Sequence, residues 1–594
     1  MKTPFLFLLI VCSCSSMMLG QVEWTRYSEE NPNSTTGPGT ATSHDIALDP
    51  VGNLVITGDC SGKSSFEDVV FPTSVYNSMF LTSYNKAGGL RWAKPIFGNS
   101  NNHAFAVATD NSGNVFMAGE YRQTNANTIL DFGDITMTGV SSPSGFLAKA
   151  DSNGTFLWSK SILSAPPADV VITDMQVDPA GNAYVFGTME DSVLVDSLVY
   201  NQGNNGLMMF LAKYLPNGDL AWFKHSNTID NPDYGSFISA HMQIGGEGQI
   251  YLNGGFFSFP IFNGYLGWDT DTIFNVLGGG QFLARFDGDG KLEWWRSMDG
   301  GTTQYPHEMG IDEQGNIYLT MQHGNQMQFT DATLDPNDFD GRLILVKYSP
   351  AGERLFTTDV AYGNISSSGD IRNQSVTIHT RPNGTTFLSG LYGSNSSSFI
   401  VFGHQDTLPM PNNSNDGARQ FLTSFDKDGN YIDVGVLVEE YIGAPSFFWE
   451  NTAMVSNPEG DFYLTGKFAG QLRLDMDSLL APGTGSANGQ AFAVKFDPQG
   501  ILDLSTTSVE DELAATSLKL YPNPAKEILN IELAEMAQNT AVHLRIFTLN
   551  GQLLMEQDFW GNQYQIRLDG LSPGLYLLDL QPADKRLSRR FVVE

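Results

Sequence analysis

The sequence predicts an all-β protein: a seven-bladed β-propeller followed by a small C-terminal β-sandwich. Three observations lead to this prediction. A hairpin unit recurs seven times, a second turn motif precedes each copy, and the composition changes after residue 505. The clearest copies of the hairpin are Phe146–Trp158 and Phe210–Trp222, in which an apolar strand, a Gly turn and a second strand with Trp follow one another.

The hairpins recur about every 70 residues. Two motifs that recur in the same order at one period are hard to produce by chance, so we interpret them as a true repeat. Five of the seven turns read Asn/Asp-x-x-Gly, and the other two are Leu215–Gly218 and Ser349–Gly352. The seven copies begin at Phe80, Phe146, Phe210, Phe282, Ile344, Phe421 and Phe492.

The second motif is an Asp-x-x-Gly-Asn turn that leads into an apolar strand. Its clear copies are Leu48–Gly58, Asp110–Gly119, Asp178–Gly187 and Asp312–Leu319, and weaker copies lie at Gly246–Gln249, Arg381–Gly384 and Asn457–Gly460. Gly supplies the positive φ of tight turns, and the aromatic and β-branched residues suit buried strands. Each unit therefore offers about four antiparallel strands, as in a propeller blade. A solenoid of the same units is the structural alternative.

The two ends of the repeat region complement each other. The seventh unit closes with Ile501–Leu504, which lacks Trp, whereas Val22–Ser28 resembles the Trp strand Leu90–Lys94 without a unit of its own. We expect the N-terminal strand to pair with the last unit and cover its edge. The alternative is a loose terminal strand.

Between the two motifs, each unit carries a stretch of variable length. Because functional residues on rigid scaffolds concentrate in such connections, these stretches are candidate ligand-binding loops; the alternative is a solvated connector without a role. Examples are Ile129–Ile135, Phe329–Leu334, Phe399–Phe402 and Leu472–Leu479.

Charge and hydropathy exclude several classes of function. The net charge is −33, which repels nucleic acid and anionic lipid. No apolar window of about 20 residues follows the N-terminus, so no membrane-spanning segment is expected.

The N-terminus reads as an export signal, residues 1–20. Lys2 precedes the apolar run Phe5–Val11, and cleavage after Gly20 leaves Gln21 first. A lipid on Cys14 is the alternative. After cleavage Cys60 is the only thiol, so no intramolecular disulfide is expected.

No motif predicts catalysis, a cofactor or a metal site. His44 and His307 occupy the same place in their units, on the strand expected to be innermost, but the equivalent positions offer no third ligand, and structural His is favoured. Asp287–Gly290 and Asp426–Gly429 resemble the start of a calcium loop, but Met298 and Leu437 stand where the bidentate Glu is required, and plain turns are favoured. The positions equivalent to the two His are Phe105, Thr173, Ala240, Val376 and Thr452.

A polar linker, residues 506–516, separates the repeats (21–505) from a tail at 517–594, in which eight Lys/Arg and nine Asp/Glu nearly balance. The tail resembles the C-terminal sorting domain of the type IX secretion system. The resemblance lies in Leu520–Ala525, Ile528–Ile531, Ile546–Gly551, Leu571–Tyr576 and Arg589–Val593. Its motif residues are Tyr521, Pro522, Asn523, Pro524, Gly574, Tyr576, Arg589 and Arg590.

The resemblance implies a small β-sandwich, interaction with the type IX machinery and export across the outer membrane. Removal of the domain, then release or attachment to surface glycolipid, follows in that family. The final Glu594 departs from the usual basic or polar end. The seven units also resemble the propeller repeats of many exported bacterial proteins, which names no ligand.

The sequence therefore favours a secreted or cell-surface binding protein over an enzyme. Its extracellular ligand, a glycan or a protein, stays open. The alternative is a secreted polysaccharide hydrolase or lyase whose carboxylates converge from several units.

Overall fold

The computed structural model is all-β in the residues that it describes, which divide into two compact units, Val22–Leu504 and a second that contains residues 505–594. The described residues are 22–30, 39–62, 64–72, 74–98, 100–122, 129–138, 143–164, 168–190, 192–200, 207–226, 235–258, 267–268, 271–272, 280–299, 308–323, 327–329, 333–334, 342–363, 376–392, 399–403, 406–409, 419–438, 440–442, 453–457, 459–468, 471–474, 477–480, 489–497, 518–522, 525–533, 541–548, 553–568, 570–572, 574–582 and 587–593.

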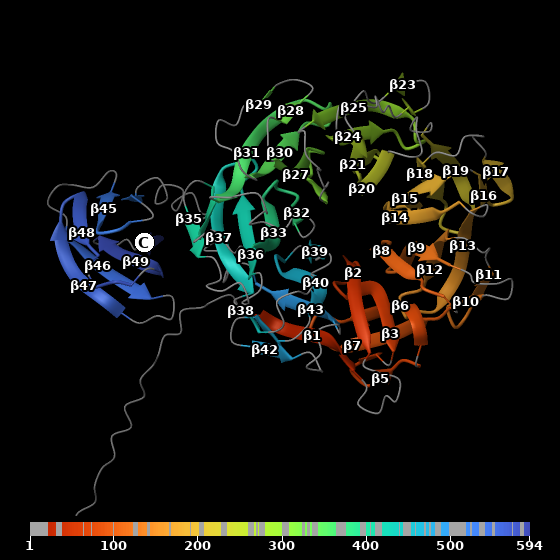
Figure 1. The fold of residues 1–594 in the computed structure, drawn as a ribbon, viewed down its shortest axis with the longest axis horizontal. Helices are drawn as coiled ribbons and strands as arrows, with labels where there is room; N and C mark the ends of the chain where they lie inside the picture. Colours follow the sequence, from red (N-terminus) through yellow and green to blue (C-terminus); the bar gives the residue numbers. More distant parts are fainter. Residues whose placement is uncertain are drawn as a thin grey trace, which may run out of the picture. The chain divides into compact units, whose positions relative to one another are not determined.

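Seven antiparallel sheets in the larger unit share one plan of four core strands, paired in the order first, second, third, fourth. Each strand pairs with the next through a short turn or a longer connection, so the unit of sequence and the unit of structure nearly coincide. Figure 1 shows these sheets one after another around a common centre, with the first strand of each nearest the middle.

The core strands of the first four sheets are β2 (Thr40–Leu48), β3 (Leu54–Gly62), β6 (Ser74–Tyr84) and β7 (Leu90–Ile96); β8 (His103–Thr109), β9 (Val115–Tyr121), β12 (Ser144–Ala150) and β13 (Phe156–Ser164); β14 (Val170–Val177), β15 (Ala183–Glu190), β18 (Leu207–Tyr214) and β19 (Leu220–His225); and β20 (Gly235–Ile244), β21 (Ile250–Ser258), β24 (Gly280–Phe286) and β25 (Leu292–Asp299).

The core strands of the last three sheets are β26 (Met309–Ile311), β27 (Ile317–His323), β30 (Arg342–Tyr348) and β31 (Arg354–Gly363); β32 (Thr377–Thr380), β33 (Thr386–Tyr392), β36 (Arg419–Phe425) and β37 (Tyr431–Val438); and β39 (Ala453–Ser456), β40 (Phe462–Phe468), β43 (Gln490–Phe496) and β1 (Val22–Glu30). The first strand of each sheet contacts the first strand of the next sheet. The order is β2, β8, β14, β20, β26, β32 and β39, and β39 in turn contacts β2.

The Asp-x-x-Gly-Asn motif forms the turn between the first and second strands. In the first sheet, Asp49 Oδ1 accepts hydrogen bonds from the N–H groups of Val51 (3.0 Å) and Asn53 (2.8 Å), and Asn53 Nδ2 donates to Asp49 Oδ2 at 2.7 Å. Gly52 has φ +82°, which a side chain disfavours. Asp110, Asp178 and Asp312 make the same bonds in their turns. The Asp and Asn therefore recur because each satisfies the turn backbone of its own sheet.

The Trp and Gly of the hairpin motif contact each other across neighbouring sheets. Trp92 Nε1 donates to the carbonyl of Ser152 in the next sheet at 3.1 Å, and a Cβ on Gly154 would lie 2.9 Å from the Trp92 ring. Gly154 also has φ +77°. Trp158, Trp222 and Trp294 repeat this arrangement over Gly218, Gly290 and Gly352. The Trp and the Gly therefore recur in the repeat because they pack against each other between neighbouring sheets.

The N-terminal strand pairs with the last repeat, as predicted. β1 is antiparallel to β43, with Thr25 opposite Val494 and Tyr27 opposite Phe492. Trp24 Nε1 donates to the carbonyl of Lys86 in the first sheet at 3.0 Å, and Gly88 lies under its ring. β1 therefore supplies the Trp that the seventh unit lacks. The second arm of the seventh hairpin, Ile501–Leu504, lies outside the described residues.

The variable stretches are not free loops, which corrects the expectation from the sequence. Each contains a two-stranded hairpin, here called an insert hairpin. Four of these hairpins pair with the outermost strand of the preceding sheet: β4 with β1, β16 with β13, β28 with β25, and β34 with β31. The other three pair with residues that follow just after such a strand. The insert hairpins are β4 (Ser64–Phe66) with β5 (Val69–Val70), β10 (Ile129–Asp131) with β11 (Thr136–Thr138), β16 (Val193–Val195) with β17 (Leu198–Tyr200), β22 (Gly267–Trp268) with β23 (Asp271–Thr272), β28 (Met327–Phe329) with β29 (Thr333–Leu334), β34 (Phe399–Phe402) with β35 (Asp406–Pro409), and β41 (Gln471–Leu474) with β42 (Asp477–Leu480), which pairs with β38 (Glu440–Ile442).

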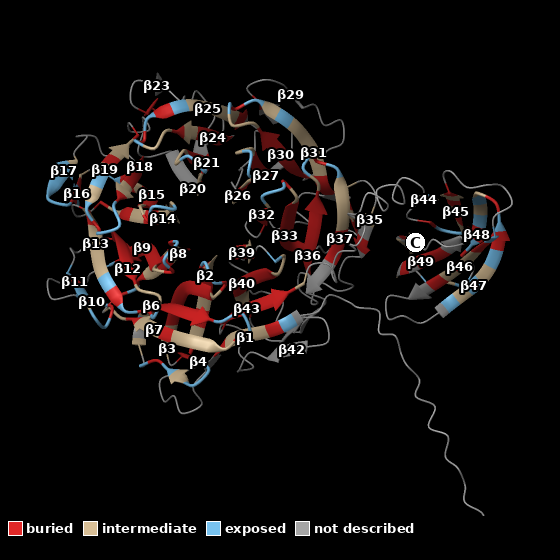
Figure 2. Ribbon diagram, turned by 180° about the vertical axis from the view of Figure 1, so that it is seen from behind, coloured by how far each residue is buried: buried red, intermediate tan, exposed pale blue. Residues whose placement is uncertain are grey.

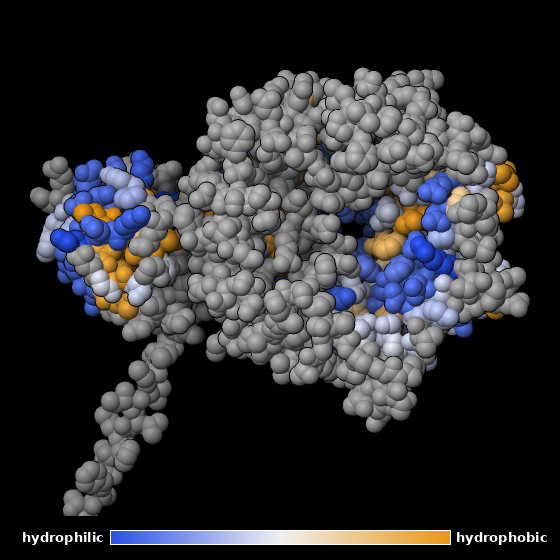
Figure 3. Space-filling view, in the orientation of Figure 1, coloured by the Kyte–Doolittle hydropathy of each residue, from blue (hydrophilic) through white to orange (hydrophobic). Residues whose placement is uncertain are grey.

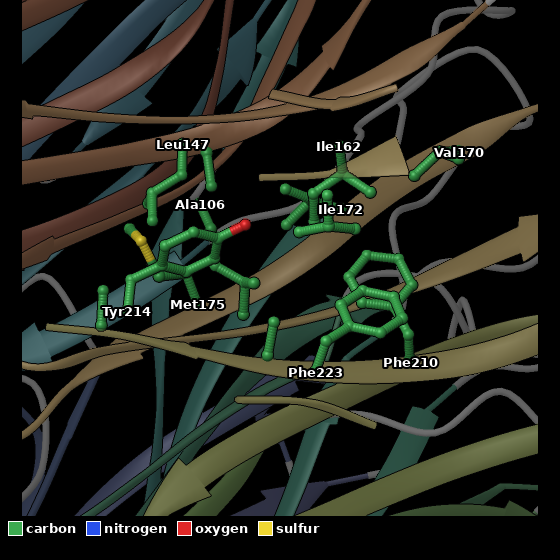
Figure 4. Packing of buried hydrophobic residues seen from close by; sticks show 14 of the residues in the cluster. Ala106, Leu147, Ile162, Val170, Ile172, Met175, Phe210, Tyr214 and Phe223 are labelled. Atoms are coloured by element: carbon green, nitrogen blue, oxygen red, sulfur yellow. The ribbon is translucent and has the colours of Figure 1, made fainter. Parts of the chain in front are cut away.

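The hydrophobic core lies between successive sheets. Figure 4 shows Ala106 and Leu147 of the second sheet beside Met175 and Tyr214 of the third, with Ile162 beside Ile172, all of them buried. In Figure 2 burial follows the core strands, whereas β17 is largely exposed; in its partner β16, Val193 and Val195 are buried. Because large apolar side chains fill the space between sheets, each sheet depends on its neighbours for burial.

The C-terminal unit has two antiparallel sheets around one core. The first is β44 (Leu518–Tyr521), β45 (Ile528–Leu533) and β48 (Gln563–Arg567). The second is β47 (Leu553–Trp560), β46 (Ala541–Thr548), β49 (Gly574–Pro582) and β50 (Leu587–Val593). Alternate residues of both sheets, such as Leu529, Ile531, Leu544 and Ile546, are buried in a common cluster, as a two-layer all-β domain requires.

Candidate functional site

A cluster of two His and two carboxylates lies between the first and second sheets. Asp59, near the end of β3, accepts a hydrogen bond on Oδ2 from His44 Nε2 at 3.0 Å and another from His103 Nδ1 at 2.5 Å. Asp59 Oδ1 accepts the N–H of Ala104 at 3.2 Å. Two imidazoles from two sheets therefore share one carboxylate.

The shared carboxylate sets the protonation of the cluster. Burial alone would raise the pKa of Asp59, but the two His outweigh it and the pKa of Asp59 is lowered. The hydrogen bond that His103 donates to Asp59 raises the pKa of His103. Asp59 thus fixes the His103 ring and favours its imidazolium form, which leaves Nε2–H as a donor on the other side of the ring.

Glu120, near the end of β9, stands on that other side. Its Oε1 is 4.0 Å from His103 Nε2 and 4.0 Å from Arg122 Nε, which is ion-pair range and too long for a hydrogen bond. The side chain of Glu120 is only 10% exposed, and burial raises its pKa. Arg122 is 51% exposed and His103 26%. A buried carboxyl therefore faces two accessible cationic groups across a gap.

An aromatic ring completes the cluster, which we call the Glu120 site: His44, Asp59, His103, Phe105, Glu120 and Arg122. The Phe105 ring is stacked on His103 with centroids 5.7 Å apart and meets His44 edge-on at 5.7 Å. Phe105 is half-buried, so part of the ring remains accessible.

The strand directions fix the end of the sheets at which this site lies. His103 begins β8, and Asp59 and Glu120 lie near the ends of β3 and β9, so all three are remote from the turns at 49–53 and 110–114. They lie where the chain leaves for the insert hairpins. Figure 3 shows hydrophilic residues gathered in the region of β8 and β9 in Figure 1.

The sequence singled out His44 and missed most of its partners. His307, its counterpart in the repeat, lies outside the described residues. The equivalent Phe105 belongs to the Glu120 site, whereas Thr173 and Val376 belong to other sheets. A usable signal existed: Asp59 and Glu120 each follow the Gly that ends the second motif, Gly58 and Gly119.

A second group of ionisable side chains lines the inner strands. Asp45 on β2, Asp174 on β14 and Glu308 just before β26 hold the same place in their units. Each carboxyl bonds the inner strand of the next sheet: Asp45 accepts Val107 N–H at 2.8 Å, Asp174 accepts Met242 N–H at 2.7 Å, and Glu308 accepts the hydroxyl of Thr377. These carboxyls therefore join neighbouring sheets.

Burial dominates the titration of this inner group. Burial raises the pKa of Asp45 well above its usual range, and raises the pKa values of Asp174 and Glu308 to about 7. The same burial lowers the pKa of His241, whose Nδ1 is 3.9 Å from Asp174, to about 4. Asp174 and His241 nevertheless keep 15% and 33% of their side-chain surface accessible.

Replacement of Asp174 by Asn will make stability less dependent on pH. The folded-state pKa of about 7 lies above the usual 3.8, so the folded protein holds a proton that the unfolded chain has lost between these values. The free energy of unfolding therefore falls as pH rises through this window. Asn removes the charge but keeps only one of the two oxygens that accept from Met175 and Met242. We therefore expect Asn to cost about 1–2 kcal/mol near pH 5 and to raise the free energy of unfolding by on the order of 2 kcal/mol near pH 8.

Chemical denaturation at about pH 5 and about pH 8 measures this effect. Asp428→Asn, at a 63% exposed side chain, is the matched control and should change stability by less than about 0.5 kcal/mol. An Asp174→Asn protein that loses stability equally at both pH values would contradict the prediction.

The two calcium-like segments are hairpin turns. Asp287 Oδ1 accepts the N–H groups of Asp289 (3.0 Å) and Lys291 (2.9 Å), and Asp426 binds its own turn in the same way. Within the described ranges, no group of three or more His, Cys, Asp or Glu has an arrangement that could hold a metal ion. Cys60 is a buried free thiol whose pKa burial raises.

The predicted sorting residues occupy different places in the C-terminal unit. Tyr521 is 46% exposed at the end of β44, whereas Tyr576 is buried and donates through its hydroxyl to the carbonyl of Ser572 at 2.6 Å. Arg589 Nη1 donates to the carbonyl of Leu518 at 2.5 Å, which links the two sheets. Gly574 begins β49, Arg590 pairs with Leu577, and Asn523 and Pro524 lie outside the described residues.

Comparison with known families identifies the tail. Residues 519–594 match the family described as the secretion system C-terminal sorting domain, which confirms that part of the resemblance. A type IX sorting domain implies interaction with the type IX machinery and indicates a secreted or cell-surface protein. Among the described residues, no helix has the length and apolar character needed to cross a membrane.

Other comparisons show similarity at a low level of sequence identity. The uncharacterized WD repeat-containing protein L264 of Acanthamoeba polyphaga mimivirus is 21% identical over 473 residues, which cover 65% of this chain and 32% of that protein. The chain thus spans about a third of the length of that curated relative. Two solved structures are similar at a low level: a protein of unknown function from Dyadobacter fermentans (9% identity, 64% of this chain, 96% of that chain, TM-score 0.33) and the extracellular domain of a putative hybrid two component system from B. thetaiotaomicron (10%, 95%, 88%, 0.15).

Proposed function

We propose that the seven sheets are the blades of a β-propeller that acts outside the cell as a binding module. The observation that carries the propeller is the Trp24 contact. β1 extends the seventh sheet, and its Trp makes with the first sheet the same contact that Trp92 and Trp158 make between consecutive sheets. One contact repeated at the junction of first and last units supports a ring rather than an open solenoid.

The domain boundaries belong to the same proposal. An export signal at 1–20 precedes the propeller at 21–505, a linker at 506–516 follows, and a β-sandwich at 517–594 carries the sorting signal. The separate cores of the two units support this division. Tyr521, Gly574, Tyr576, Arg589 and their neighbours Pro522, Asn523, Pro524 and Arg590 are the proposed sorting residues.

Binding is favoured because the Glu120 site offers accessible donors and a ring on a rigid scaffold. The ligand is a glycan or a protein, and neither nucleic acid nor a cofactor is part of the proposal. The experiment is a screen of the secreted protein against glycan and protein arrays. Saturable binding that is lost on unfolding supports the proposal, and the absence of any binding contradicts it.

A secreted polysaccharide hydrolase or lyase is the second candidate. It is favoured by the inner carboxyls Asp174 and Glu308, whose pKa values near 7 suit proton transfer at neutral pH. Assays for reducing ends and for unsaturated products, on neutral and uronic polysaccharides, test it. Turnover abolished by Asp174→Asn or Glu308→Gln in a folded protein would replace binding with catalysis.

Removal of the tail will block export and leave the larger unit folded. A chain that ends before Ser517 retains every described strand of the larger unit, from β1 to β43. We expect the shortened protein to accumulate in the periplasm with an unchanged unfolding transition for its larger unit. The measurement is immunoblotting of medium, surface and periplasmic fractions, with calorimetry of the purified protein.

A reporter provides the control for this truncation. Residues 517–594 fused behind an export signal and an inert reporter should carry the reporter out of a cell with a type IX system. If the shortened protein reaches the medium at the normal level, or unfolds, the separation of folding from sorting is wrong.

A further inference from the structure

The carboxyl of Glu120 has charged neighbours but no hydrogen bond in the described part of the chain. His103 Nε2 and Arg122 Nε both stand 4.0 Å from its Oε1, and its side chain is 10% exposed. Burial raises the pKa of Glu120, although the two cations at ion-pair distance oppose this effect.

One chemical group fits this gap better than others. A hydroxyl oxygen placed among the three can donate its proton to Glu120 and accept hydrogen bonds from His103 Nε2–H and Arg122, because a hydroxyl is one donor and two acceptors. An ammonium group has no acceptor for the two cationic donors, and a carboxylate has no proton for Glu120. Of these three ligand groups, only the hydroxyl can satisfy Glu120, His103 and Arg122 together.

The surroundings of the gap suit a ring that carries several hydroxyls. Phe105, half-buried and stacked on His103, offers an apolar face beside the polar groups. Sites for small polar ligands combine such a surface with a few placed hydrogen-bonding groups. A sugar ring has both features, with C–H groups on its faces and hydroxyls at its edge.

Charge argues for a neutral sugar. The acidic groups are Asp59 and Glu120, with Asp169 acting on Glu120 from the chain before β14. The basic groups are His103 and Arg122, with His44 paired to Asp59. These charges nearly balance, whereas the whole chain carries −33 and repels polyanions.

We propose that the Glu120 site binds a neutral saccharide, with one sugar hydroxyl bridging Glu120, His103 and Arg122 and the ring lying against Phe105. The inference rests on the proposed binding function and names its ligand class and its place. It needs no metal and no covalent step.

The experiment measures binding of the full secreted chain to an array of neutral hexose and pentose oligosaccharides, with uronic and sulfated oligosaccharides and basic peptides as comparison arms. Glu120→Ala should weaken the affinity for the neutral glycan about 10- to 100-fold, as loss of a charged hydrogen-bond acceptor does. Glu459→Ala is the matched control, a 61% exposed Glu in the turn at the far end of the sheets, and should leave affinity unchanged.

Stability separates a ligand-binding role from a structural one. Glu120→Gln removes a buried charge, so it should keep or raise the melting temperature while weakening binding. A clear fall in melting temperature with unchanged binding would mean that Glu120 only supports the fold. Both variants are read by calorimetry before any binding measurement, so unfolded protein is not mistaken for lost affinity.

The pH profile is an independent readout. Above the raised pKa of His103, the ring keeps Nδ1–H for Asp59 and its Nε2 loses the proton that it would donate. Affinity should therefore fall as pH rises through this value, and the profile should flatten in His103→Gln.

The outcomes distinguish this inference from the broader function. The neutral-saccharide assignment is wrong if the protein prefers uronic glycans or basic peptides, or binds no glycan at all. Binding of another ligand at another site would still support the proposed binding function. Neutral-glycan binding that Glu120→Ala does not change overturns the site.

Discussion

Replacing Trp24 with Ala will lower the free energy of unfolding of the larger unit by about 3–5 kcal/mol, the range for deletion of a buried aromatic ring. Trp24 is 8% exposed, and its Nε1 donates to the carbonyl of Lys86 at 3.0 Å. Its ring also lies 6.3 Å from Tyr84 and 6.0 Å from Tyr463, which belong to the first and seventh sheets. The substitution therefore weakens the junction of the first and last units.

The measurement is denaturant unfolding followed by circular dichroism. Trp560→Ala, at a 67% exposed position of the C-terminal unit, is the matched control and should cost less than about 0.5 kcal/mol. A loss at Trp24 no larger than that control would mean that the N-terminal strand is not an integral part of the seventh sheet.

Replacing Gly88 with Ala will destabilise the same unit by about 2–5 kcal/mol, through two separable causes. Gly88 has φ +82°, a conformation that costs Ala about 1–2 kcal/mol, and its new Cβ would lie 2.8 Å from the Trp24 ring. The Trp24 ring cannot easily move away from this Cβ because its Nε1 donates a hydrogen bond to the backbone carbonyl of Lys86.

Gly133 provides the matched control, because its φ is +90° and a Cβ there would meet nothing within 4 Å. Gly133→Ala should cost only the conformational part. In a Trp24→Ala background, Gly88→Ala should also fall to that smaller value, since a double-mutant cycle isolates the contact. Equal costs at Gly88 and Gly133 in the natural background would contradict the steric argument.

The sequence predicted those parts of the fold that are encoded within a unit. The turn at Asp49–Asn53 and the hairpin turns are local, so each carries its own Gly and Asp signals. The placement of β1 was also predictable, because Val22–Ser28 contains the Trp that the last strand of the seventh unit lacks. Both predictions are confirmed by the strand pairing and the turn hydrogen bonds.

The pairing of the insert hairpins was not predictable from the sequence. β16 and β28 are three residues long, too short for an alternating pattern, and their partner strands belong to the preceding unit. Variable length suggested loops, but hydrogen bonding to an exposed sheet edge decided the structure.

The candidate site was predictable only in part for a similar reason. Position in the repeat identified His44, but Asp59, His103 and Glu120 come from three further strands of two sheets. Their convergence depends on how neighbouring sheets pack, and no spacing in the chain encodes it. The inner carboxyls Asp45, Asp174 and Glu308 share a repeat position and could have been found by aligning the units.

The pairing of β1 with β43 also imposes an order on biosynthesis. β1 is the first of the described strands to be translated, but its pairing with β43 must wait. The hydroxyl of Ser28 donates a hydrogen bond to the side chain of Gln490, which lies 462 positions further along the chain. Until that residue is made, β1 can pair with the short strand β4 but not with β43, so the edge that faces β43 stays open. An open edge of this kind is a place for pairing with another nascent chain. Whatever protects this protein during synthesis must therefore guard the two ends of the repeat region rather than its middle.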